Sequence, residues 1–254
     1  MQLVKDKLLF SPSDLITFME SPFASHMERW CLVEKQIKSL MDEADPLLKS
    51  LQSRGYAHED EFLDSLVAGG RDVVKLERAS PEVMIGDTSA NLEIGVDVIA
   101  QAYLEIGQFG GFSDFLIKVP GASRLGDFHY EVWDTKLAKK MKPYFAVQLS
   151  CYAEMLECLQ GVKPNEVAVV LGSGEIKRLR LMDYYHYYQS LKASFLEFHE
   201  NWSADTLPDP ADSKAHGRWS QYAANLLLDR RHLSNVANIS RSQIKRLEAA
   251  GVAT

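Results

Sequence analysis

Hydrophobic residues recur at helical spacing throughout the first quarter of the chain. Residues 11–20 open with a serine and a proline, a typical helix start, and a Ser-Pro break at 21–22 separates them from a second helical stretch at 23–40. After a polar turn, the same spacing predicts a long helix over residues 46–67. The N-terminal part is therefore expected to be helical.

The pattern then changes to that of strands. Three runs rich in β-branched and aromatic residues, at 96–104, 111–119 and 128–136, are separated by glycine-rich turns, which is typical of neighbouring strands. A short strand is predicted at 73–76 before them. The ambiguous stretch 81–94 is interpreted as a helix.

Helix and strand alternate in the next part of the chain. The pattern predicts an amphipathic helix at 144–159, an apolar strand at 166–171, its hairpin partner at 175–181 and a long helix at 183–202. The order of helix, three strands, helix and strand is typical of an α/β domain with a central mixed sheet flanked by helices.

A proline-rich linker at 208–212 precedes two further predicted helices, 219–228 and 233–250. The chain is accordingly divided into a domain over residues 1–207 and a linker with a helical segment over 208–254. Because the last helix ends in a glycine cap that leads into further residues, the chain is interpreted as a fragment of a longer polypeptide, with a further domain beginning in this segment.

Composition narrows the class of protein. A chain of 254 residues with 46% hydrophobic content can bury a sizeable core. Its three cysteines show no CxxC spacing, so neither a disulfide framework nor a zinc site is indicated. There is no apolar run of membrane-spanning length, and a cytoplasmic protein is expected. No GxxxxGK[ST] phosphate loop occurs, so no ATP site is expected in this chain. The formal charge of −7 is an average over the whole surface, so it does not exclude nucleic-acid binding at one groove.

Acidic residues and a lysine lie in two of the predicted strands. Asp114 lies in the second strand of the meander, and Asp134 and Lys136 close the third. Side chains two apart in a strand share a face, so Asp134 and Lys136 point the same way and Glu131 points the other way. This alternation removes Glu131 as a candidate ligand. Carboxylates beside an ammonium group can hold a divalent metal.

Two helices add polar candidates. Gln148 and Tyr152, at i and i+4, lie on one face of the helix that follows the third strand, and His58 lies on the long helix before the sheet. Each piece alone has an ordinary interpretation, because an Asp-x-Lys at a strand end is usually a solvated edge and a histidine beside a glutamate is usually a surface residue. Their combination in this order is a more specific signal.

The combined motifs resemble those of RecB-type nucleases in the PD-(D/E)XK superfamily. Each motif keeps the spacing of that family: His58, Gly111-x-x-Asp114, Asp134-x-Lys136 and Gln148-x-x-x-Tyr152. The likeness covers essentially the whole chain and is closest to bacterial RecB-like nucleases that precede helicase-like or ribonuclease-H-like domains. It implies a restriction-endonuclease-like core of order αβββαβ with a C-terminal helical appendage.

The resemblance also implies a metal-dependent DNA nuclease and a set of ligands. His58, Asp114, Asp134 and the carbonyl of Thr135 would bind Mg²⁺ or Mn²⁺, the nitrogen ligand making Mn²⁺ more plausible than at an all-oxygen site. Lys136 would orient or deprotonate the attacking water, or stabilise the pentavalent phosphorus; the sequence leaves these roles open.

Gln148 and Tyr152 would position Lys136 and the substrate phosphate. The expected catalytic set is Asp114, Asp134, Lys136, Gln148 and Tyr152. Lys139, Lys140 and Lys142 follow the third strand and either track a nucleic-acid backbone or form a solvated loop.

The implied substrate is DNA, as single strands or ends, in repair, recombination or defence, with a helicase-like domain as partner in the same polypeptide. Two alternatives stay open at this point. One is a catalytically inactive nuclease fold that binds nucleic acid or docks other domains, and the other is an RNA-directed nuclease.

One departure from the family concerns iron–sulfur clusters. Several RecB-type relatives hold a cluster with one early and three late cysteines, whereas here Ser21 occupies the early position and no cysteine follows Cys158. No cluster is therefore expected. Cys151 and Cys158 are interpreted as core residues of their helix.

Overall fold

The computed structural model describes residues 1–5 and 7–252, which divide into two compact units. The sheet unit comprises Gln2–Ile16 and Asp45–Ser194, and the helical unit comprises Met1, Thr17–Ala44 and Phe195–Thr254. Residues 253 and 254, on which the fragment hypothesis partly depends, lie outside the described residues. The expected division between residues 207 and 208 stays a prediction.

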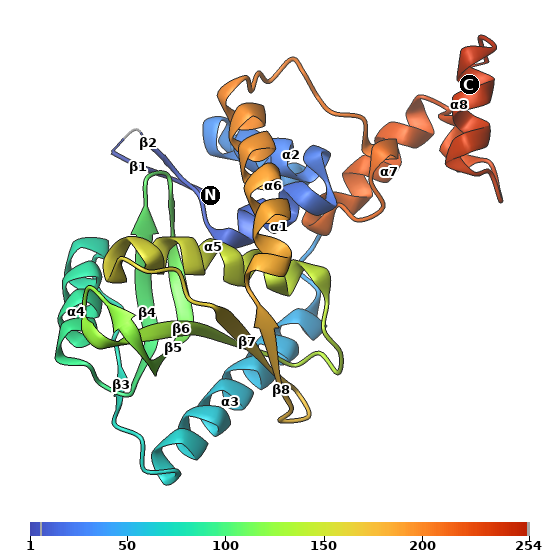
Figure 1. Ribbon diagram of the computed structural model, residues 1–254. Helices are drawn as coiled ribbons and strands as arrows, with labels where there is room; N and C mark the ends of the chain where they lie inside the picture. Colours follow the sequence, from blue (N-terminus) through green and yellow to red (C-terminus); the bar gives the residue numbers. More distant parts are fainter. Residues whose placement is uncertain (6, 253–254) are drawn as a thin grey trace. The chain divides into compact units, whose positions relative to one another are not determined.

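A six-stranded mixed sheet forms the centre of the sheet unit (Figure 1). Its strands are neighbours in chain order: β3 (Val73–Lys75), β4 (Val98–Ile106), β5 (Phe109–Ser123), β6 (Gly126–Lys136), β7 (Glu166–Leu171) and β8 (Ile176–Arg180). The β3–β4 and β6–β7 pairs are parallel, and the other pairs are antiparallel. The predicted α/β class with a mixed sheet is confirmed.

Continuous apolar sequences explain why the inner strands are buried on both faces. Strand β7 reads Glu-Val-Ala-Val-Val-Leu and is buried after its first residue, and β4 begins with an equally buried Val-Ile-Ala run. Strands β4 and β5 are joined by a two-residue turn in which Gly107 has a φ of 59°. Glycine adopts this conformation without a steric penalty, so the turn fixes the register of the hairpin.

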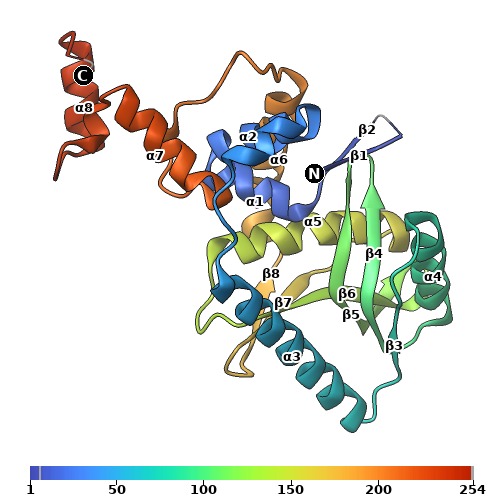
Figure 2. The same ribbon diagram turned by 180° about the vertical axis from the view of Figure 1, so that it is seen from behind.

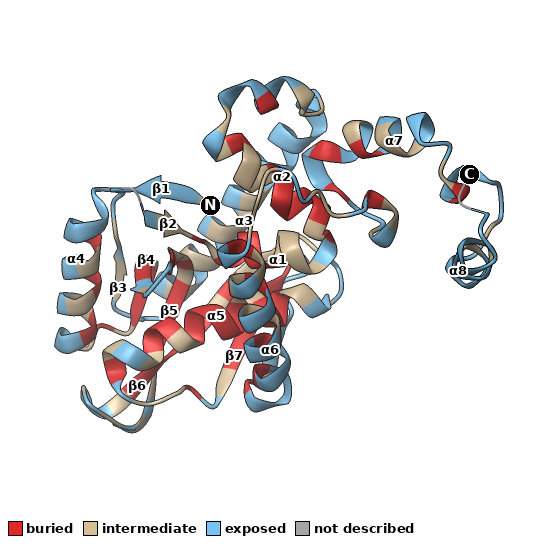
Figure 3. Ribbon diagram, turned by 90° about the horizontal axis from the view of Figure 1, so that it is seen from above, coloured by how far each residue is buried: buried red, intermediate tan, exposed pale blue. Residues whose placement is uncertain are grey.

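Helices cover both faces of the sheet. Figures 1 and 2 show α3 (Pro46–Ala68) on one face and α5 (Pro143–Gln160) on the other. Phe62 of α3 packs edge-on against Phe115 with ring centroids 5.2 Å apart, and stacks on Trp133 at 6.2 Å. Figure 3 shows that buried residues gather in the sheet and on α5.

Five more elements complete the sheet unit or begin in it. They are the β1–β2 pair (Gln2–Val4 and Lys7–Leu9), α1 (Pro12–Glu20), α4 (Pro81–Ile94) and α6 (Met182–Glu200). Helix α4 contacts β4, where the Thr88 hydroxyl accepts the N–H of Tyr103. Among the described residues, no helix is long and apolar enough to cross a membrane. The expected cytoplasmic location stays a prediction.

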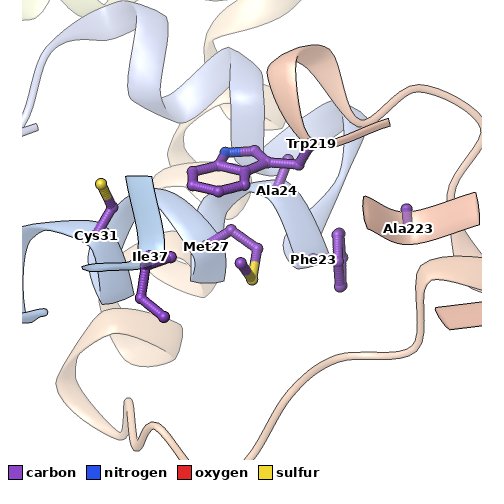
Figure 4. Packing of buried hydrophobic residues seen from close by; sticks show 7 residues of the cluster. All are labelled: Phe23, Ala24, Met27, Cys31, Ile37, Trp219 and Ala223. Atoms are coloured by element: carbon purple, nitrogen blue, oxygen red, sulfur yellow. The ribbon is translucent and has the colours of Figure 1, made fainter. Parts of the chain in front are cut away.

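The helical unit is built around one tryptophan. Its elements are α2 (Pro22–Val33), α7 (Ser220–Asp229), α8 (Arg241–Ala249) and the 3₁₀ turns η1 (Lys35–Leu40), η2 (Pro210–Asp212), η3 (Gly217–Trp219) and η4 (Leu233–Asn235). Trp219 is fully buried, and Figure 4 shows its indole over Met27 and Ala24. The indole N–H donates to Glu28 Oε1 at 2.8 Å, so the one polar group of the ring is satisfied.

Two predictions about local structure are wrong. The continuous helix expected over 233–250 is a 3₁₀ turn followed by α8, because Asn238 has a φ of 63° and Ser240 caps α8 in a capping box with Gln243. Cys151 is buried, but Cys158 is exposed. The buried stripe of α5 ends in Leu156 and Gln160, and a residue two positions from each points away from that stripe.

Candidate active site

Strands β5 and β6 separate where the two predicted acids lie. Their ladder runs from the Ser123 end only as far as the Phe115–Trp133 pair. One residue beyond it, Asp114 Oδ2 accepts the N–H of Thr135 at 2.9 Å and the Thr135 hydroxyl at 3.1 Å. A side-chain carboxylate thus takes the place of a strand carbonyl, and the opened strands leave room for a second acid.

Asp134 is that second acid, with only 3% of its surface exposed. Burial raises the pKa of its carboxyl well above the usual range, and the charge of Asp114 together with a hydrogen bond between the two carboxyl groups raises it further. Lys136 Nζ lies 2.5 Å from Asp134 Oδ2 as an ion-pair partner. Within the described residues, this buried oxygen has no hydrogen bond of good geometry.

Lys136 shares a face of β6 with Asp134, as strand alternation predicts. Burial alone would lower the pKa of its ammonium group, but the carboxylates of Asp134 and Asp114 outweigh burial and raise it. Its Nζ also lies 5.7 Å from the centre of the Phe145 ring at the start of α5. Lys136 is therefore a charged group held between two acids and an aromatic face.

Tyr152 joins this group from α5. Its hydroxyl lies so close to the backbone of Gly111 that a Cβ at that position would be 2.9 Å away. Burial, followed by the charges of Asp134 and Asp114, raises the pKa of the Tyr152 phenol well above its usual range. Gly111 is the first residue of the Gly111-x-x-Asp114 motif. Because it has no side chain, it leaves the space that Tyr152, the last residue of the Gln148-x-x-x-Tyr152 motif, occupies.

The remaining predicted residues lie at the margin of this group. Gln148 is half-buried one helical turn before Tyr152, and its positioning role stays a prediction. Thr135 pairs with Val170 in the parallel β6–β7 ladder, and the Val170 carbonyl lies 3.4 Å from His58 Nε2. The structure therefore places His58 over β7.

The pair of acids fits a hard divalent cation. Mg²⁺ and Mn²⁺ bind one or two carboxylates together with water and phosphate oxygens, and here two carboxyl groups meet, one of them buried and paired with Lys136. Across the part of the chain that the structure describes, no three His, Cys, Asp or Glu side chains form a group that could hold a metal. The predicted metal-ligand roles of His58, Asp114, Asp134 and the Thr135 carbonyl stay predictions.

Glu59 is a residue of this site that sequence reasoning missed. Burial and then the charge of Asp114 raise the pKa of its carboxyl, and Gln101 Nε2 donates to its Oε1 at 2.6 Å. Gln101 has a φ of 57° in the middle of β4, opposite Asp114, a conformation that costs free energy in a non-glycine residue. The sequence signal for Glu59 is its position directly after His58. Of these two neighbours, only His58 is predicted from the sequence as a site residue.

Glu131 lies apart from the acid pair, as its position in the strand predicts. Its buried carboxylate accepts two bonds from Arg178 Nη2, at 2.8 and 2.9 Å, and one from the Trp133 indole at 3.1 Å. These partners account for the charge of Glu131 without a metal. Arg178 also bonds Glu166 at 2.6 Å, so this network ties β6 to β7 and β8.

Comparison with known proteins assigns no family: no protein-family model matches the chain, and no curated protein matches it either.

Proposed function

We propose that this protein is a metal-dependent DNA nuclease, a phosphodiester hydrolase with a RecB-like PD-(D/E)XK core. The observation that carries the proposal is the pair of buried Asp134 and half-buried Asp114, with Lys136 2.5 Å from Asp134, placed where β5 and β6 separate. A purely structural sheet gains nothing from a buried acid next to a second acid, since burying charge costs free energy. Such an arrangement is typical of a functional site.

The reaction is the attack of water on a phosphodiester. A bond forms between the water oxygen and phosphorus, the bond from phosphorus to one sugar oxygen breaks, and negative charge grows on the phosphoryl and leaving oxygens. The attacking water gives up one proton, and the released sugar oxygen takes up one to become a hydroxyl group. Asp114 and Asp134 would hold Mg²⁺ or Mn²⁺, which when bound supplies charge neutralisation at the phosphate and lowers the pKa of water.

The other residues of the site act on the substrate directly. The ammonium of Lys136 would face the phosphoryl oxygens and stabilise their growing charge, with its position fixed by Asp134 and the Phe145 ring. The buried Tyr152 hydroxyl would donate a hydrogen bond within the same site. Water is excluded on this side by α5, whose inner face is buried along its length.

The test uses Asp134→Ala and Lys136→Ala on a labelled single-stranded DNA oligonucleotide with Mn²⁺ or Mg²⁺. Both variants are expected to lose cleavage by a factor of at least about 100, because each removes charge stabilisation at the reacting phosphate. The matched control is the Asp97–Lys118 ion pair, 3.1 Å apart in the same sheet, where Lys118→Ala should leave cleavage unchanged. Circular dichroism confirms that each variant is folded.

Cleavage that is equal in wild type and both site variants would refute the proposal. DNA binding without Mn²⁺ binding and without cleavage would favour the inactive binding module instead. Parallel assays with RNA of the same sequence separate an RNA-directed nuclease from a DNA nuclease. A helicase-like domain in a longer polypeptide, and a role in repair, recombination or defence, remain part of the same proposal.

A further inference from the structure

Helix α3 has two halves of opposite character. Residues 46–57 carry Lys49 and Arg54 as their only charged residues, whereas residues 58–68 carry four acids and no lysine or arginine. The first half also exposes large apolar side chains, with Leu47 61%, Leu48 56% and Leu51 41% exposed. The basic and apolar half ends at His58 and Glu59, where the helix reaches the candidate site.

Tyr56 is the one aromatic residue of this half, and 65% of its surface is accessible. It precedes Glu59 by three residues, so the two side chains lie on the same face of α3, about one turn apart. Glu59 in turn lies within the electrostatic reach of Asp114. An exposed aromatic ring one turn from a phosphodiester-cleaving site is placed to stack on a base next to the scissile phosphate.

A basic loop follows Lys136 in the chain. Lys139, Lys140 and Lys142 are exposed in the segment between β6 and α5. The segment is anchored, because the N–H of Gly172 donates to the Ala138 carbonyl at 3.2 Å. Figures 1 and 2 draw this segment and the first turns of α3 on the same side of the sheet unit.

Aromatic contacts connect the basic loop to the site. Lys142 Nζ lies 5.5 Å from the centre of the Tyr144 ring, and the Tyr144 and Phe145 rings meet edge to face at 4.7 Å. The Phe145 ring is in turn 5.7 Å from Lys136 Nζ. The loop is therefore connected to the candidate catalytic lysine through the rings of Tyr144 and Phe145.

We propose that the first half of α3 and the basic loop together bind single-stranded DNA, with Tyr56 stacking on a base and Lys139, Lys140 and Lys142 contacting phosphates. The inference rests on the proposed nuclease function and specifies its substrate. A duplex hides the faces of its bases, whereas an unpaired strand offers them to an exposed ring. Charge complementarity selects a polyanion, since every charged side chain in these two segments is basic.

Binding is measured by fluorescence anisotropy of a labelled oligonucleotide, with a chelator present so that the strand stays intact. Tyr56→Ala should weaken binding about tenfold and Tyr56→Phe should retain it, because stacking needs the ring and not the hydroxyl. Tyr187→Ala is the matched control, since Tyr187 is 57% exposed on α6, outside both segments.

A second measurement tests the lysines. Replacing Lys139, Lys140 and Lys142 by alanine should reduce the slope of log affinity against log salt concentration by about 2, because each lost phosphate contact on a single strand contributes about 0.7. The cleavage assay with Mn²⁺ is run on the same variants. A folded Tyr56→Ala variant should cut a single strand less efficiently at subsaturating DNA.

The outcomes separate the two proposals. If wild type cleaves DNA but Tyr56→Ala binds as tightly as wild type, the inference about α3 is overturned and the nuclease function stands. If duplex is bound as tightly as single strand and the triple lysine variant keeps the wild-type salt slope, the inference is likewise overturned. If wild type neither binds nor cleaves DNA, both proposals fail together.

Discussion

At the scale of single residues, Gly111 couples two motifs that are far apart in the sequence. A Cβ at this position would lie 2.9 Å from the Tyr152 hydroxyl and 3.3 Å from Pro12 Cδ. Tyr152 is buried on α5 and cannot swing into solvent. The glycine is therefore required by the close approach of a rigid side chain.

We expect Gly111→Ala to destabilise the protein by about 1 to 3 kcal/mol, because the added methyl group displaces a buried ring. Adding Tyr152→Phe should recover part of this loss, since it removes the nearest atom. Urea unfolding measures both effects. Gly86→Ala is the control: no atom lies within 4 Å of its added Cβ, and alanine favours a helix, so stability should rise by up to about 1 kcal/mol. Equal effects of the two alanines would contradict the coupling.

The sequence alone places Asp134 and Lys136 on one face of their strand, because side chains two residues apart in a strand point to the same side. The sequence alone did not identify Glu59 as a site residue. That assignment depends on how far α3 lies over the strands and on the left-handed Gln101, whose amide holds the Glu59 carboxylate. Neither the distance between elements nor a backbone outlier follows from residue spacing.

At the scale of elements, α3 is held to the sheet by few contacts. None of its residues is fully buried, and Phe62 supplies the main aromatic contact, to Phe115 and Trp133. Leu63 and Leu66 add smaller apolar contacts to the same cluster. Phe62 is thus the largest apolar contact among those that attach this helix to the sheet.

We expect Phe62→Ala to cost about 2 kcal/mol, less than for a fully buried phenylalanine because Phe62 is half-buried. Hydrogen exchange in α3 should increase more than exchange in α5. Phe62→Leu should lose less than half as much, because it keeps most of the apolar contact. Unchanged exchange in α3 of the alanine variant would show that other contacts hold the helix.

Most elements follow from sequence periodicity, since helix and strand spacing differ and prolines mark the starts of several helices. The error over 233–250 has a local cause. Apolar spacing continues through this stretch, but Asn238 takes a left-handed conformation and Ser240 offers a cap, and together they restart the helix at Arg241. The spacing of apolar residues alone does not show whether a helix continues or ends and restarts at a capping box.

At the scale of the whole molecule, buried groups in the two units have pKa shifts that change stability in opposite directions as pH falls. Burial lowers the pKa of His26 in the helical unit to about 4, so the folded state resists protonation and loses stability as pH falls from about 6.5. Burial lowers the pKa of His216 in the same unit as well. In the sheet unit the pKa of Asp134 is raised, so its contribution to stability grows as pH falls.

We expect the unfolding free energy of the helical unit to drop by about 2 kcal/mol from pH 7 to pH 5 through His26 alone. His26→Phe should remove that part of the drop, because an apolar ring fits between Trp30 and Trp202 without binding a proton. Urea unfolding at both pH values, followed by tryptophan fluorescence, measures it. A variant with the full wild-type pH dependence would contradict the assignment to His26.

The division into units is a property that the linear sequence conceals. Residues 17–44 belong with the chain from Phe195 onward, although 150 residues of the sheet unit, 45–194, lie between them. The link is made by side chains such as Trp219, whose indole packs on α2. A composition change marks a linker, but it does not reveal which distant segments share a core.

The bond between Asp114 and the amide of Thr135 gives the site its own spectroscopic label. A strand amide is normally bonded to a neutral carbonyl, whereas this one is bonded to a carboxylate that also adjoins Asp134. Its nitrogen and proton chemical shifts will therefore follow any change of charge at the acid pair. A single resonance of the resting protein can be used to watch protons or cations arrive, before any substrate has been identified.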